Sequence, residues 1–183
     1  MSRYIHYAHL SEIGVPGAKV PLGRYVERGD IVGKVGSSGN SSGPHLHAEI
    51  MMSKPISWRQ YTRGKSHFSV QRGYQDPKKF YDNSQSIPIS IEYPIVGYGF
   101  MQFVKDGTRP YGGYWHPGDD ANGIRDFGKD VRSLLPGRIV HIEDVSWLKN
   151  KFGKWLKTDW NGGWGRHLFI EVDEAKCAEL GLI

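Results

Sequence analysis

The feature that most constrains the fold is the way glycines interrupt short apolar runs. In GRYVERGDIVGKVG, residues 23–36, glycines and charged residues separate four aliphatic residues: Val26, Ile31, Val32 and Val35. Runs this short cannot build an amphipathic helix, but they suit strands that end in tight turns. Gly, Tyr and Trp are also abundant, with 24, 10 and 6 copies, which favours strands over helices. The sequence therefore predicts a mainly β protein with a small antiparallel sheet or sandwich core and long loops.

Length and charge limit the classes of protein. A chain of 183 residues can bury one core but not two large ones, so one domain is expected. The formal net charge of +5 favours polyanionic partners. The basic residues are scattered and match no nucleic-acid-binding motif, so nucleic acid is not an expected partner.

The sequence also bears on redox state and location. Cys177 is the only cysteine, which excludes a disulfide within the chain and predicts a packing role. No apolar run is long enough to span a bilayer. The start, MSRYIHYAHL, lacks the pattern of a signal peptide, so an export route other than a leader in this chain is expected.

The chain divides into two segments of different character. Residues 1–82 and 92–183 carry the strand-like runs, with the clearest strands expected at 138–142 and 167–172. From about Ile50 to Ile91 the sequence is polar and indicates a connecting stretch. Within it, only DPKKFYDN suggests a short helical turn. Residues 83–91 are predicted to be the connector proper.

A His-x-His pattern in the first segment can carry chemistry. Alternation along HLHAEI places His45, His47 and Glu49 on one face of a strand. One imidazole could bind a metal while its neighbour handles a proton. An isolated pattern of this kind is often just a solvated face, but the turn-rich GSSGNSSGP before it would aim the strand at a fixed point.

A second cluster lies in the other segment, in His116-Pro-Gly-Asp119-Asp120. Pro117 and Gly118 discourage a helix, so a loop is expected that lets an imidazole and a carboxylate reach one ion. The residues alone do not choose between Asp119 and Asp120. With His47, this set supplies two nitrogens and one oxygen, which suits Zn²⁺ with a position left for water.

The remaining histidines carry weaker signals. His9 stands in YAHLSEI, where the alternation is less clear. A structural role is the simpler interpretation for His6. His141 and His167 have no partner that the sequence indicates, and they are predicted to be packing or surface residues.

These pieces together resemble the lysostaphin-like (LytM-type) zinc metallo-endopeptidases. The resemblance is carried by YAHLSEI, by VERGDIVGKVGSSGNSSGPHLHAEI, by HPGDD, by GKDV with PGRIV, and by GGWGRHLFIEV. It implies that His116, Asp120 and His47 are the zinc ligands, which selects Asp120 over Asp119. It also implies that His9 and His45 are catalytic residues that handle protons and stabilise the oxyanion.

The order of the two halves departs from the family. In the family, HxxxD precedes YAHLS and HLH, whereas here residues 1–82 match the C-terminal half of the domain and residues 92–183 the N-terminal half. The resemblance therefore implies one catalytic domain in circularly permuted order. The two halves would form this domain within one chain, as a monomer, or two chains would exchange halves in a swapped homodimer. The third possibility is that the sequence covers half of each of two tandem peptidase domains.

The implied activity is hydrolysis of peptide bonds in bacterial peptidoglycan, in its stem or cross-bridge. The site of action would be the cell wall, outside the cell or in the periplasm, and a phage origin would fit the start of the chain. The alternative is a non-catalytic relative that binds the wall or regulates an amidase.

Overall fold

The computed structural model describes most of both segments. The described residues are 2–14, 18, 20–55, 67–81, 97–107, 112–122, 125–144, 148–149, 155–156 and 163–183. The expected connector, residues 83–91, lies outside them, as do most residues of the Lys- and Trp-rich stretch 149–161.

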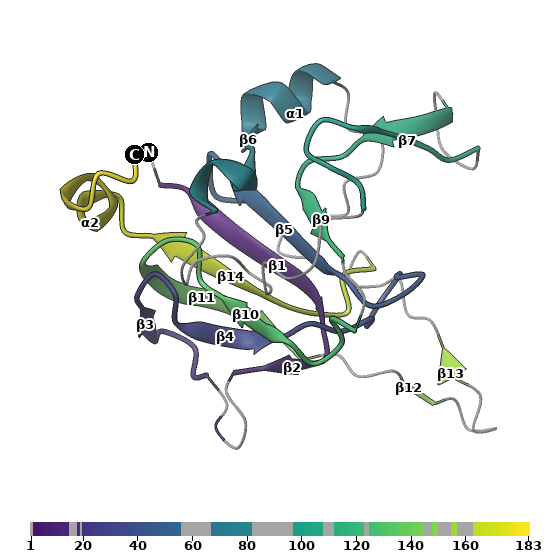
Figure 1. Ribbon diagram of the computed structural model, residues 1–183, viewed down its shortest axis with the longest axis horizontal. Helices are drawn as coiled ribbons and strands as arrows, with labels where there is room; N and C mark the ends of the chain where they lie inside the picture. Colours follow the sequence, from purple (N-terminus) through teal and green to yellow (C-terminus); the bar gives the residue numbers. More distant parts are fainter. Residues whose placement is uncertain are drawn as a thin grey trace.

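A seven-stranded sheet forms the centre of the molecule (Figure 1). Its strand order is β3-β11-β14-β1-β5-β6, and β9 pairs with β5 as well. Every pair in it is antiparallel. The strands are β1 (Tyr4–Leu10), β3 (Tyr25–Val26), β5 (Leu46–Met51), β6 (Tyr74–Gln75), β9 (Asp119–Ala121), β11 (Gly137–Glu143) and β14 (Arg166–Val172).

Strands from both sequence segments pair with one another in this sheet. β1, from the first segment, pairs on one side with β14 from the second and on the other side with β5. The two ends of the chain lie together at one corner (Figure 1), where Arg3 forms an ion pair with Glu174. The two segments thus complete one sheet within a single chain.

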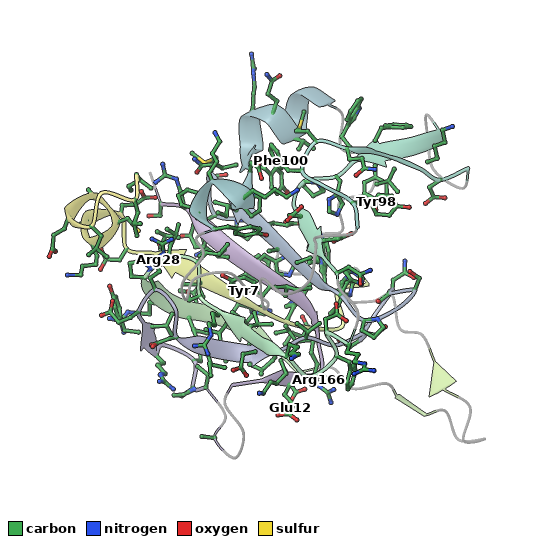
Figure 2. The ribbon with its side chains drawn as sticks, in the orientation of Figure 1. Tyr7, Glu12, Arg28, Tyr98, Phe100 and Arg166 are labelled. Carbon is green, nitrogen blue, oxygen red and sulfur yellow. The ribbon has the colours of Figure 1, made fainter. Side chains whose placement is uncertain are left out.

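A smaller sheet packs with the main sheet and shares its core. It contains β10 (Asp130–Arg132), β4 (Ile31–Lys34) and β2 (Glu12–Ile13) in that order. Tyr7 of β1, labelled near the centre of the molecule in Figure 2, is fully buried, and its hydroxyl accepts a hydrogen bond of 2.8 Å from the backbone N–H of Leu134. One apolar cluster includes residues of both sheets, such as Ile5 and Val32. A mainly β architecture with antiparallel sheets is therefore confirmed.

Short elements surround the two sheets. Two hairpins are made by β7 (Phe103–Lys105) with β8 (Gly113–Trp115) and by β12 (Leu148–Lys149) with β13 (Trp155–Leu156). The helices are α1 (His67–Gly73), the 3₁₀ helix η1 (Pro77–Phe80) and α2 (Glu174–Glu179). Cys177 is buried in α2 and belongs to the core cluster, as its packing role predicts. Among the described residues, none of these helices has the length and apolar character to cross a membrane.

One expectation about the polar stretch was wrong. Residues 67–81 are not a plain connector, because they form α1, β6 and η1. β6 extends the main sheet beside β5, with Ile50 opposite Gln75. The short helical turn expected in DPKKFYDN is η1, where the Asp76 side chain accepts a hydrogen bond from the Lys78 N–H. Sparse apolar residues hid these elements, because an edge strand and a single turn need few buried side chains.

The main sheet has one apolar face and one polar face. Alternate residues such as Ile5, Leu168 and Ile170 belong to the core, and the residues between them point to the other side. On that other side, His6 pairs in register with Glu49, and Glu143 pairs with His167. Residues directly opposite in a ladder share a face. Histidines and carboxylates therefore lie side by side across four neighbouring strands.

Candidate metal centre

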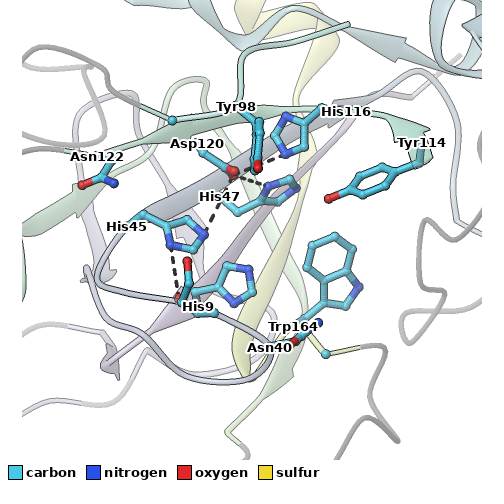
Figure 3. A pocket seen from close by; sticks show the side chains of 14 residues that line it. His9, Asn40, His45, His47, Tyr98, Tyr114, His116, Asp120, Asn122 and Trp164 are labelled. Carbon is cyan, nitrogen blue, oxygen red and sulfur yellow. Dashed lines mark hydrogen bonds and ion pairs between the residues drawn. The ribbon is translucent and has the colours of Figure 1, made fainter. Parts of the chain in front are cut away.

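Three side chains that can bind a metal meet where β5 and β9 pair. His47 stands opposite Asp120 in the ladder, and His116 lies four residues before Asp120. The Oδ1 atom of Asp120 is 2.8 Å from His47 Nδ1 and 3.4 Å from His116 Nε2. One ligand atom from each of the three residues lies within 4.8 Å of the others. Figure 3 shows Asp120 at the meeting point of these contacts.

Close backbone packing holds the HPGDD segment against β5. A Cβ atom at Gly118 would lie 2.2 Å from the carbonyl oxygen of Ala48, so glycine is required at this position. The N–H of His116 donates to the carbonyl of Gln102 at 2.8 Å. The segment was predicted to be a loop, but its second half is strand β9. Pairing with β5 fixes the direction of Asp120 more firmly than a loop would.

Hydrogen bonds on the far sides of both imidazoles orient the rings. His116 Nδ1 lies 2.8 Å from the carbonyl oxygen of Gly118, which can only accept, so Nδ1 carries the proton. His47 Nε2 donates in the same way to Glu49 Oε1 at 2.8 Å. His47 Nδ1 and His116 Nε2, the nitrogens that face Asp120, are therefore the ones that would bind a cation. This carboxylate–histidine arrangement is the usual second layer around zinc, and the donor set fits that ion.

The charges of the cluster are strongly coupled. Burial by itself would lower the pKa of His47, but hydrogen bonds to Asp120 and Glu49 outweigh it and raise the pKa to about 10. Burial opposes ionisation of Asp120, yet hydrogen bonds with His116 and His47 hold the pKa of its carboxyl well below the usual range. The pKa of Glu49 is lowered by His47 and His6 against the effect of burial. Both carboxylates are thus kept ionised, while the His47 ring is protonated near pH 7, so a cation that bound Nδ1 would displace a proton.

The two histidines predicted to be catalytic lie beside this cluster. The rings of His9 and His45 are 4.7 Å apart, centre to centre, and His45 Nε2 is 4.0 Å from Asp120 Oδ1. His9 Nδ1 donates to the carbonyl of Ser38 at 2.8 Å, and His45 Nδ1 to that of Gly43 at 2.9 Å. The Nε2 atom of each ring is therefore left as a proton acceptor.

His9 has an unusual backbone conformation. Its φ angle is +62°, where residues other than glycine are strained, and such strain concentrates at functional sites. The irregularity between Tyr7 and Leu10 in the β1–β14 ladder lies here, and it turns the His9 ring away from the alternation of β1. Burial, followed by the neighbouring His45 and His47, lowers the pKa of His9 to about 3. His9 is thus neutral near pH 7.

A pocket opens over these side chains. The His9 and His45 rings lie on one side of it, and Tyr98 and Tyr114 lie on the other (Figure 3). Trp164 also lines it, with its ring 4.9 Å from that of His47. An extended chain could cross such an open, aromatic-lined groove with its backbone near Asp120.

The structure separates the two neighbouring aspartates. Asp119 is fully buried and points away from the imidazoles, since it accepts a hydrogen bond from the Tyr81 hydroxyl at 2.9 Å and lies 3.3 Å from Lys78 Nζ. Asp120 faces His47 and His116. All five residues predicted for the site, His9, His45, His47, His116 and Asp120, line the same pocket.

Some residues of this region were missed or misjudged from the sequence. Glu49 was placed on the correct strand face but given no role, although it binds His47. His141 and His167 were predicted to be packing or surface residues with no partner that the sequence indicates, and the structure places both against Glu143. Alternation in His141-Ile142-Glu143 was the visible signal. The register that sets His167 opposite Glu143 could not be read from one sequence.

Comparison with known proteins gives one match. The family model described as Peptidase family M23 matches residues 2–58, a range that includes His9, His45 and His47 but ends before HPGDD. The first segment is therefore similar to peptidases of that family. No curated protein and no solved structure matches the chain.

Proposed function

We propose that this protein is a zinc metallo-endopeptidase of the lysostaphin-like M23 type, which hydrolyses peptide bonds of bacterial peptidoglycan. One observation carries the proposal: His47, His116 and Asp120 come from both segments and converge within ligand distance. The match to Peptidase family M23 supports the proposal for the first segment, and His47 Nδ1 and His116 Nε2 both face Asp120 Oδ1.

His47 Nδ1, His116 Nε2 and Asp120 Oδ1 would hold the zinc ion. Zinc bound there would polarise the scissile carbonyl and make water a nucleophile near neutral pH. Glu49 keeps the His47 ring in its orientation through the 2.8 Å hydrogen bond, and its negative charge makes the ring a stronger ligand.

His9 and His45 would move the protons. Each has its Nδ1–H committed to a backbone carbonyl, so each presents an unprotonated Nε2 to the pocket. A neutral imidazole can take a proton from the attacking water and then donate it to the leaving amine, and while protonated it can donate a hydrogen bond to the developing oxyanion. Burial keeps His9 neutral, so its Nε2 lone pair faces the pocket without a proton.

The permuted order fits the pairing of the strands. Residues just before β1 and just after β14 touch, through the Arg3–Glu174 ion pair and the bond from the Val172 N–H to the Arg3 carbonyl at 2.9 Å. A short loop there would join the segments in the family order. We infer one catalytic domain formed by residues 1–82 and 92–183, with closure within a monomer; a swapped homodimer would build the same site.

Peptides of the cell wall suit this pocket, and the protein would act there, outside the cell or in the periplasm. The net charge of +5 favours contact with anionic wall polymers. Tyr98, Tyr114 and Trp164 offer aromatic surface along the pocket, where a peptide could pack its apolar side chains.

The test is cleavage of purified peptidoglycan by the zinc-loaded chain, with new peptide termini identified by mass spectrometry. His9→Ala and His45→Ala should each keep zinc and lose turnover. His116→Ala should lose turnover and the zinc ion of this site, and His45→Ala is its matched control because it removes an imidazole from the same pocket.

Two results would refute the proposal. Near-normal cleavage by His9→Ala or His45→Ala would remove these residues from the proton transfers. Binding of peptidoglycan by the unsubstituted, zinc-loaded chain without any new peptide termini would instead support the wall-binding or amidase-regulating alternative.

A further inference from the structure

A second group of histidines and a carboxylate lies on the same sheet face as the candidate zinc site. His141 and Glu143 are two residues apart on β11, and Glu143 stands opposite His167 on β14. One ligand atom from each lies within 4.8 Å of the others. This group has the same composition as the first, two imidazoles and one carboxylate.

The geometry of this second group matches a metal site more closely than a set of hydrogen bonds. His141 Nε2 lies 3.6 Å and His167 Nε2 lies 3.5 Å from the same oxygen, Glu143 Oε2. Charge-assisted hydrogen bonds are shorter, about 2.7–2.9 Å. Two ligands at about 2.0–2.1 Å from a tetrahedral zinc ion lie about 3.3 Å apart. In the first group, His116 Nε2 and Asp120 Oδ1 show a similar separation of 3.4 Å.

The buried environment of this group favours binding of a cation. The side chain of His167 is 0 % exposed and that of Glu143 is 8 % exposed. A carboxylate withdrawn from water to this degree is stabilised by positive charge beside it. The His141 side chain is 23 % exposed, so an ion could enter from that side and keep a water molecule as a further ligand.

We propose that His141, Glu143 and His167 bind a second divalent transition-metal ion of the zinc class. The donor set of imidazoles and a carboxylate excludes a preference for Ca²⁺ or Mg²⁺, which favour oxygen ligands. The ion joins β11 to β14. His6 separates it from the first group, with its ring 5.1 Å from that of His167 and 6.2 Å from that of His47. This second site is therefore structural, not part of a paired catalytic centre.

The test counts zinc ions in the full-length chain. Protein equilibrated with Zn²⁺ and freed of excess by gel filtration is analysed for zinc by mass spectrometry. We expect two ions per unsubstituted chain, one in Glu143→Gln, one in His116→Ala and none in the double variant. Glu171→Gln is the matched control, since Glu171 lies on β14 and bonds to the Tyr4 hydroxyl; it should keep both ions.

The outcomes separate this inference from the proposed function. Zinc content in Glu143→Gln equal to that of the unsubstituted chain would overturn the second site whatever the activity. Loss of one ion in Glu143→Gln, with wall cleavage absent in every variant, would keep the second site and reject the peptidase. Circular dichroism checks that each variant folds. Cobalt gives an independent readout: His116→Ala loaded with Co²⁺ should show the absorption of a tetrahedral site, and the His116→Ala, His141→Gln double variant should not.

Discussion

The two histidine–carboxylate groups on the polar sheet face differ in what surrounds them. Around His47, His116 and Asp120, hydrogen bonds to Gly118 and Glu49 orient the rings, and two further imidazoles share an open pocket. Around the second group, the nearest imidazole is that of His6, which stacks on Phe169 at 4.1 Å and is fully buried. Similar ligands can therefore form either a catalytic or a structural site. A bound metal can catalyse a reaction only where substrate reaches it and a base lies beside it.

Removing the carboxylate of each group should show this difference most clearly. Asp120→Asn should reduce peptidoglycan cleavage by about a thousandfold or more, about 4 kcal/mol of transition-state stabilisation. Glu143→Gln should leave cleavage within about threefold, because its site is structural and lies outside the pocket of the first group. Initial rates on one peptidoglycan preparation measure both. Equal losses in the two variants would remove the distinction between the groups.

Glu49 tests how far the first group depends on its supporting residue. Glu49→Gln can still accept the hydrogen bond from His47 but loses the negative charge, so zinc affinity at the first site should fall by about 10–100-fold. Competition with a chelator of known affinity measures this. Glu171→Gln, which removes a carboxylate from the same sheet face, should leave affinity unchanged. A similar loss in both variants would point to a general electrostatic effect.

The sequence predicted the first group well because its signals are local. HLHAEI places His45 and His47 by alternation, and HPGDD holds His116 and Asp120 four residues apart. Family resemblance was still needed to choose Asp120, since the environment of Asp119, with Tyr81 and Lys78, is set by η1 and the residue after it. The spacing of the glycines was sufficient to predict a mainly β fold.

The second group could not be predicted for a physical reason. It depends on the register of β11 and β14, which sets His167 opposite Glu143, more than twenty positions away. A shift of one residue in any pairing would turn these side chains to the core. β6 escaped notice for a similar reason, since Tyr74 and Gln75 become a strand only by pairing with β5.

Zinc should stabilise the fold through both groups independently. At a free zinc concentration ten times the dissociation constant, each site adds about 1.4 kcal/mol, or about 3–6 °C in melting temperature for a chain of this size. His116→Ala and Glu143→Gln should each show about half of the zinc-induced shift of the unsubstituted chain. A full shift in Glu143→Gln, measured by calorimetry with and without a chelator, would mean that the first group alone accounts for it.

The smallest expected effect concerns acid stability near the first group. The pKa of His9 is lowered to about 3 by burial and by its neighbouring imidazoles, while an unfolded histidine titrates near 6.5. Below pH 6.5 the unfolded chain therefore binds a proton that His9 does not bind in the folded chain, so the free energy of unfolding decreases as the pH falls from 6.5 to about 3.

His9→Asn removes this group, and asparagine tolerates the φ of +62°. In the presence of chelator, the variant should lose about 0.7 kcal/mol less than the unsubstituted chain between pH 7 and 6. Urea unfolding at both pH values measures the difference, and identical losses would show that His9 takes up its proton in the folded state.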